Sequence, residues 1–282
     1  MKLAFSTLGV PGMPLEDVRA LALRTGWTGI EVLSSADEPV HTGLDGPARA
    51  AARRLLADGV TLLSVNSYVH VGRTDQSDEE VVTSILAEAR LAADLGATAV
   101  RVFPGAEGGT GAVVGAGAGL EAGTARIVAR LSGAARLLPP GVGIWLETHD
   151  SHSTGAEVAA LLDEIADRRV RALWDIAHSC RRGEPWETTL DVLRPHLAHV
   201  QIKDEEPTGR HLPVPLGEGA VPVAAVLRRL SAEGYGRWVS LEWERKWYPA
   251  VAPLDEVLAK ARTWLRDTVH ATAERADGAE RP

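Results

Sequence analysis

Short runs of aliphatic and β-branched residues alternate along this chain with longer runs whose apolar residues recur at helical spacing. The first pair is "KLAFSTLG" (2–9), which predicts a strand, and "LEDVRALALRTG" (15–26), which predicts a helix. Further strands are predicted at 29–35, 61–72, 97–105, 142–150, 170–179, 198–206 and 237–245. Helical patterns lie between them, for example at 79–96, 155–167 and 222–234, and a last one at 254–269 follows the eighth strand.

Eight strands that are each followed by a helix are typical of a (β/α)8 TIM barrel. We therefore predict an α/β fold of a single domain, with the barrel over residues 1–269 and a polar C-terminal tail over 270–282. A doubly wound sheet is the structural alternative, but eight units without a break in composition favour closure. The glycine-rich segment 105–119 lacks the spacing of a phosphate-binding loop, so we interpret it as a flexible loop after the fourth strand, with a mobile lid over the active face as the functional alternative.

Composition limits the classes of partner. The chain is 45% hydrophobic and 24% charged, with a net charge of −8, so nucleic acid is not an expected partner. No apolar run approaches the roughly 18 residues of a membrane span, and the N-terminus does not resemble a signal peptide. The single cysteine, Cys180, allows no disulfide within the chain, which suits a reducing compartment. We expect a cytoplasmic protein without a membrane partner.

Polar side chains gather where the last four predicted strands end. In a TIM barrel the chemistry takes place at these carboxyl ends. The four ends contribute Glu147, His149 and Asp150; Asp175 and His178; Gln201, Lys203 and Asp204; and Glu242 and Glu244.

Four of these side chains offer an oxygen atom from consecutive strands: Glu147, Asp175, Gln201 and Glu242. A single strand-end carboxylate is more often part of a loop salt bridge, but four such ends in order favour a shared site. Three carboxylates and one amide suit a hard divalent cation, so we predict one bound Mn²⁺ or Mg²⁺. The cation would also remove the repulsion between the carboxylates.

His149 lies two residues after Glu147, and residues at this spacing share one face of a strand. We predict that His149 orients Glu147 or Asp175 without itself binding the cation. The alternative is an ordinary hydrogen-bonded polar residue.

Lys203 shares a strand face with Gln201, whereas Asp204 lies on the opposite face. We predict that Lys203 holds Glu242 or a substrate oxygen, with a structural ion pair as the alternative. Asp204 is predicted to be a structural partner of the loop that follows.

The chain resembles the sugar phosphate isomerase/epimerase family, the xylose isomerase-like TIM barrels, which include ketose 3-epimerases, hydroxypyruvate isomerase and inosose dehydratase. The similarity rests on "LEDVRALALRTGWTGIEV", "WDIAHSCRRGEPW" and "LGEGAVPVAAVLRRLSAEGYGRWVSLEWE", and it extends over nearly the whole chain. It implies metal ligands at the same four positions. The usual third ligand is His, whereas this chain has Gln201, in a "HVQI" strand similar to that of hydroxypyruvate isomerase. The resemblance also implies that His178 and Arg210 bind substrate.

These residues predict a metal-dependent isomerase or epimerase of a sugar or sugar phosphate. Glu147 and Glu242 would transfer a proton next to a carbonyl, through an enediolate that the cation stabilises. A lyase on the same scaffold, for inosose dehydration or C-glycoside elimination, begins with the same proton abstraction and is the alternative. An endonuclease IV-like phosphodiesterase or a non-catalytic sugar-binding barrel fits these strand ends less well. The expected partner is a small sugar or sugar-derived molecule, and the sequence leaves homo-oligomer formation open.

Overall fold

A ring of parallel strands forms the centre of the computed structural model, which describes residues 1–105 and 118–270. Within these residues the ring contains β1 (Lys2–Ser6), β2 (Gly29–Leu33), β3 (Thr61–His70), β4 (Ala99–Phe103), β5 (Gly143–Glu147), β6 (Val170–Asp175), β7 (Leu197–Ile202) and β10 (Trp238–Leu241). Consecutive strands pair with one another, and β10 pairs with β1 to close the ring. The predicted single-domain TIM barrel is therefore confirmed. The predicted lid over 105–119 and the predicted tail lie largely outside the described residues.

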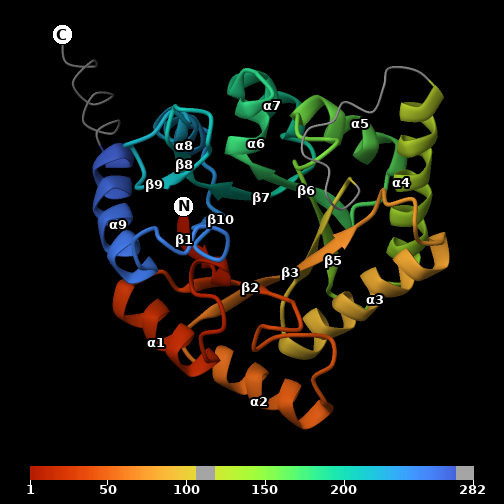
Figure 1. Ribbon diagram of the computed structural model, residues 1–282, viewed down its shortest axis with the longest axis horizontal. Helices are drawn as coiled ribbons and strands as arrows, with labels where there is room; N and C mark the ends of the chain where they lie inside the picture. Colours follow the sequence, from red (N-terminus) through yellow and green to blue (C-terminus); the bar gives the residue numbers. More distant parts are fainter. Residues whose placement is uncertain (106–117, 271–282) are drawn as a thin grey trace.

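Helices surround the ring of strands (Figure 1). They are η1 (Thr7–Gly9), α1 (Leu15–Thr25), α2 (Gly46–Leu56), α3 (Asp78–Leu95), α4 (Ala118–Leu137), α5 (Gly155–Ile165), α6 (Ile176–Arg181), α7 (Trp186–Leu193), α8 (Val223–Ala232) and α9 (Leu254–His270). Local capping fixes several of these ends. A capping box of Ser77 and Glu80 begins α3, and Gly96 ends it in the left-handed conformation at φ 86°. Among the described helices, none has both the length and the apolar character needed to span a bilayer.

Alternation along each strand separates an apolar outer layer from the inside of the ring. On β4, Val100 and Val102 belong to the buried apolar core, whereas Arg101 between them points to the other face. On β5, Ile144 and Leu146 join the same core and Glu147 does not. On these two strands the inner positions therefore carry Arg101 and Glu147, and the outer positions pack in the apolar core.

A small hairpin follows β7, at the place where the sequence predicted that the seventh strand would continue to residue 206. The strand ends at Ile202, and β8 (Asp204–Glu205) pairs antiparallel with β9 (Pro213–Val214). The buried Asp204 carboxylate accepts hydrogen bonds from the backbone N–H groups of the loop after β9, which include those of Gly217 at 2.9 Å and Val221 at 3.0 Å. Asp204 is thus a structural partner of this loop, as its strand face predicted.

Glu88 on α3 provides a test of packing outside the barrel centre. Burial raises the pKa of its carboxyl to about 7, although the nearby hydroxyl of Ser34 and the charge of Arg49 oppose the shift. The folded state therefore favours protonated Glu88, and this contribution to stability is lost as the pH rises from the ordinary value of 4.5 through about 7. Glu88→Gln should raise the free energy of unfolding at pH 8 by about 1–2 kcal/mol and change it little at pH 4.5.

Urea unfolding of both proteins at the two pH values measures this difference. Glu79→Gln is the matched control, because Glu79 is exposed on the same helix. An equal increase in the free energy of unfolding for both variants, or an increase at pH 4.5 alone, would contradict the raised pKa of buried Glu88.

Candidate active site

The carboxyl ends of β5, β6, β7 and β10 bring together four side chains that the sequence singled out. Glu147 and Asp175 are the last residues of their strands, and Glu242 directly follows β10. Gln201 lies within β7, in register with Asp175 on one side. All four residues are at most 5% exposed. The barrel therefore gathers three carboxyl groups and one amide in a buried space.

The ammonium group of Lys203 lies among these carboxylates. Its Nζ atom is 2.8 Å from Asp175 Oδ2 and 2.9 Å from Glu242 Oε2, and it also pairs with Glu244. Burial lowers the pKa of Lys203, but the attraction of the three carboxylates outweighs it and holds the pKa well above 10.5. Lys203 is therefore a buried cation that neutralises part of the cluster. Glu242 is one of the partners that the sequence suggested for it.

His178 enters the same space from α6, directly after β6. Its Nε2 atom lies 3.6 Å from Asp175 Oδ2 and 4.0 Å from Glu147 Oε1. Burial, together with the charge of Lys203, lowers the pKa of His178 well below 6.5. The imidazole is thus neutral near pH 7, so one ring nitrogen is an acceptor; Lys203 Nζ lies 3.4 Å from Nε2 and Arg181 Nη1 lies 3.4 Å from Nδ1.

His149 has a different partner from the two that the sequence suggested. Its Nδ1 atom lies 2.7 Å from Asp150 Oδ1, and the other oxygen of Asp150 lies 3.1 Å from His70 Nδ1. Asp150 adopts a left-handed conformation at φ 49°, and this tight turn after β5 accompanies the contact. His149 remains in the cluster, because one atom each of Glu147, His149 and His178 lie within 4.8 Å of one another.

Two carboxyl groups in the cluster have pKa values shifted towards neutrality. Burial raises the pKa of Glu147 well above 4.5; Arg101 opposes the shift, whereas repulsion from Glu242 and Asp175 adds to it. Burial raises the pKa of Glu242 to about 7 against the charge of Lys203. A carboxyl group with a pKa of about 7, such as that of Glu242, can both accept and release a proton at neutral pH.

The side-chain amide of Gln201 is held by Glu31, which is not among the predicted site residues. Its Nε2 atom donates to Glu31 Oε2 at 2.7 Å, and Asn66 Nδ2 donates to the same oxygen at 2.8 Å. Glu31 also contacts His199. Burial would raise the pKa of Glu31, but the interactions with His199, Ser240 and Asn66 hold it at about 2. Since the amide nitrogen of Gln201 donates to Glu31, the amide oxygen remains available as an acceptor.

Unpartnered oxygen atoms test whether this set of residues suits a cation. Glu147 Oε2 and Gln201 Oε1 are buried and accept no hydrogen bond from the described residues. Asp175 Oδ2 likewise accepts no hydrogen bond, although Lys203 Nζ lies 2.8 Å and His178 Nε2 lies 3.6 Å from it. A buried acceptor without a donor costs about 1–3 kcal/mol, and a cation would relieve that cost. Carboxylate and amide oxygens fit a hard divalent cation, whereas the set of Glu147, His149 and His178 suits zinc better.

Arg210 is the predicted site residue that the structure does not bring into the cluster. Its side chain is 70% exposed and pairs with Glu206 in the turn between β8 and β9. Arg101, by contrast, was not predicted, yet its Nε atom lies 3.3 Å from Glu147 Oε2. The available signal was a charged residue inside an apolar strand, "AVRVF", and the same signal marks Glu31 in "GIEVL".

Substitutions on β7 and β8 should separate cation binding from stability. Gln201→Leu removes one oxygen and should weaken Mn²⁺ affinity at least about 10-fold, while Asn66 and His199 still hold Glu31. Asp204→Asn places an amide nitrogen against backbone donors and should lower the free energy of unfolding by about 2 kcal/mol. Calorimetric titration with Mn²⁺ and urea unfolding measure the two effects. A loss of stability in Gln201→Leu together with a loss of Mn²⁺ affinity in Asp204→Asn would refute the assignment of cation binding to Gln201 and of stability to Asp204.

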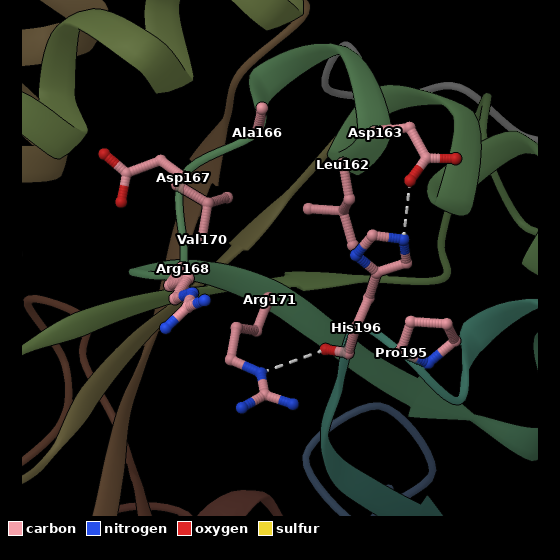
Figure 2. Close-up of a pocket in the computed structure, with 9 residues that line it drawn as sticks. All are labelled: Leu162, Asp163, Ala166, Asp167, Arg168, Val170, Arg171, Pro195 and His196. Atoms are coloured by element: carbon pink, nitrogen blue, oxygen red, sulfur yellow. Dashed lines mark hydrogen bonds and ion pairs between the residues drawn. The ribbon is translucent and has the colours of Figure 1, made fainter.

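A second hollow, of about 410 Å³, lies at the amino ends of β6 and β7 (Figure 2). His196 Nε2 lies 2.9 Å from Asp163 Oδ1 there, and Arg171 Nε donates to the His196 carbonyl at 3.2 Å. This hollow lies at the end of the strands opposite to Glu147 and Asp175. Since TIM barrels carry their chemistry at the carboxyl ends, the hollow is not the candidate active site.

The fold and the cluster define a TIM barrel with a buried acidic site at the carboxyl ends of its strands. Residues 19–268 match the xylose isomerase-like TIM barrel family, and the chain belongs to that family. This match confirms the resemblance found in the sequence.

Individual relatives are similar over different lengths. A Streptomyces coelicolor protein whose name proposes hydroxypyruvate isomerase activity is 33% identical over 93 residues, 33% of this chain. The chain spans only 29% of the length of that curated relative.

Solved structures match the whole barrel. L-ribulose 3-epimerase gives a TM-score of 0.80 at 17% identity, over 100% of this chain and 99% of that one. The IOLI protein with a bound zinc atom gives 0.77 at 20% identity, over 95% and 98%. D-allulose 3-epimerase from Methylomonas sp. gives 0.73 at 18% identity, over 95% and 98%. At these identities the likeness shows the fold alone.

Proposed function

We propose that the protein is an isomerase or epimerase that moves a proton next to the carbonyl of a small sugar or sugar-derived compound and needs one divalent cation. The observation that carries this proposal is that Glu147, Asp175, Gln201 and Glu242 lie buried at the carboxyl ends of neighbouring strands, with acceptor oxygens of the first three left without a hydrogen bond from the described residues. Membership of the xylose isomerase-like family and the partial similarity to a protein named for hydroxypyruvate isomerase activity support it.

Glu147, Asp175, Gln201 and Glu242 would hold the cation, with Mn²⁺ or Mg²⁺ preferred by their oxygen atoms. When bound, the cation would supply Lewis-acid polarisation of the substrate carbonyl. Because Lys203 now pairs with Asp175 and Glu242, it would move towards Glu244 or a substrate oxygen in the loaded protein.

Glu147 and Glu242 would perform the proton transfer. One takes a proton from the carbon next to the carbonyl, and the other returns a proton to the same carbon in epimerisation or to the neighbouring carbon in isomerisation. No oxidant or reductant is consumed. The neutral imidazole of His178 would hold a substrate hydroxyl. We assign no substrate contact to Arg210, because its guanidinium is exposed and paired with Glu206.

Proton exchange in D₂O tests this function directly. The Mn²⁺-loaded protein is incubated with ketoses, aldoses, inososes and hydroxypyruvate, and NMR follows loss of the proton next to each carbonyl. At least one compound should exchange and yield an isomer or epimer. A dehydrated product would instead identify a lyase, and the absence of exchange from every compound would refute the proposal.

A further inference from the structure

Arg101 on β4 is a buried cation whose Nε and Nη1 groups donate no hydrogen bond to the described residues. Its side chain is 4% exposed. The Nε and Nη1 atoms are fully enclosed. A buried guanidinium ordinarily donates most of its five N–H groups, so unpaired donors of this kind are costly. Such donors are expected where a ligand supplies the acceptors.

The contacts of Arg101 place it at the wall of the candidate site. Its Nε atom lies 3.3 Å from Glu147 Oε2, without the two parallel hydrogen bonds of a paired arginine and carboxylate. The guanidinium carbon lies 3.9 Å above the ring of Phe103, whose centroid is 4.2 Å from that of His149. Stacking on Phe103 fixes the plane of the guanidinium while leaving its edge unpaired.

We propose that Arg101 binds a carboxylate of the substrate, so that the protein acts on a hydroxy-oxo acid in preference to a neutral sugar. This inference rests on the proposed function, because it places the carboxylate within one or two bonds of the carbon whose proton Glu147 exchanges. A planar carboxylate matches one guanidinium edge with two parallel hydrogen bonds.

A phosphate fits this position less well. Asp175, Glu242 and Glu244 already surround Lys203, so a dianion would meet more repulsion than a monoanion. The nearby cations are already paired: Lys203 with these three carboxylates, and Arg181, which lies beside His178, with Glu205.

A matched pair of substrates tests the inference. Hydroxypyruvate and dihydroxyacetone share the same hydroxyketone. On the other side of the carbonyl, hydroxypyruvate carries a carboxylate and dihydroxyacetone carries a hydroxymethyl group. With Mn²⁺ present, the wild-type protein should exchange the C3 proton of hydroxypyruvate with a kcat/KM at least about 10²-fold higher than that for the corresponding proton of dihydroxyacetone. Arg101→Met should lower kcat/KM for hydroxypyruvate about 10²-fold and for dihydroxyacetone less than about 5-fold. For Arg101→Lys, kcat/KM for hydroxypyruvate should lie between the values of wild type and Arg101→Met. The control Arg24→Met, on the exposed face of α1, should have the wild-type kcat/KM for both compounds.

The alternatives give different results. If Arg101 serves only as a counterion of Glu147, Arg101→Met lowers exchange of both compounds equally, which overturns the inference. Preference of the wild type for dihydroxyacetone, or for a phosphorylated ketose, overturns it while leaving the proposed function intact. A wild type without exchange on any compound overturns both.

If Arg101→Met does not fold, inhibition of the wild type provides the second measurement. Pyruvate should then inhibit at least about 10-fold more strongly than hydroxyacetone. Equal inhibition would overturn the inference.

Discussion

Removal of divalent cations should reduce turnover at least about 10²-fold if the proposed function holds, because a bound cation would polarise the substrate carbonyl and lower the barrier to proton transfer by several kcal/mol. The buried oxygens of Glu147 and Gln201 that accept no hydrogen bond motivate this expectation. Dialysis against a chelator, followed by the exchange assay, measures the loss. Readdition of Mn²⁺ or Mg²⁺ should restore activity, since the proposed ligands are carboxylates and an amide.

The metal-free protein should stay folded. Lys203 pairs with Asp175, Glu242 and Glu244, so the cluster keeps a cation when the metal leaves. An unchanged circular dichroism spectrum would therefore separate loss of chemistry from unfolding. Full activity after complete metal removal would refute the cation requirement. Restoration by Zn²⁺ but by neither Mn²⁺ nor Mg²⁺ would favour the ligand set of Glu147, His149 and His178.

Glu147→Gln and Glu242→Gln should each lower the rate of proton transfer at least about 10²-fold. Each change keeps the size of the side chain and one oxygen atom, but it removes the group that accepts the proton. The exchange rate of the substrate proton in D₂O at saturating Mn²⁺ measures the effect, and calorimetric titration shows whether the variant still binds the cation.

Glu244→Gln is the comparison for these two variants. Glu244 pairs with Lys203 and lies two residues beyond Glu242, so its replacement should reduce exchange less than about 10-fold. If Glu147→Gln and Glu242→Gln both exchanged the proton at the wild-type rate, the assignment of the acid and base would be wrong. Similar losses in all three variants would indicate a general electrostatic effect.

The sequence predicts the barrel well because each unit carries its own local signal. Strand runs, helical spacing and caps such as Ser77 with Glu80 are visible within a dozen residues. The end of β7 was misplaced, since "KDEE" continues the extended pattern while Asp204 actually leaves the barrel to bind the loop that contains Gly217. Local residue patterns do not show that Asp204 binds this loop, because Gly217 lies 13 residues further along the chain.

The candidate site was predictable where polar residues stand at strand ends, and it was incomplete where they stand inside strands. Glu147, Asp175 and Lys203 meet as the strand order requires. Arg101 and Glu31 were missed, although each interrupts an apolar strand in the same way as Gln201. The bond from Gln201 to Glu31 crosses the barrel between β7 and β2, and strand periodicity does not specify which inner residues meet.

The pairing of β1 with β10 also has a kinetic consequence. Lys2 is in register with Trp238 and Phe5 with Leu241, so the two ends of the barrel must find each other before the ring is complete. Contacts between such distant segments slow folding, because chain entropy is lost before the contact forms. Since β10 leads into Glu242, catalytic competence should arise in one late step. In a refolding experiment, recovery of proton exchange should therefore lag behind recovery of helical signal.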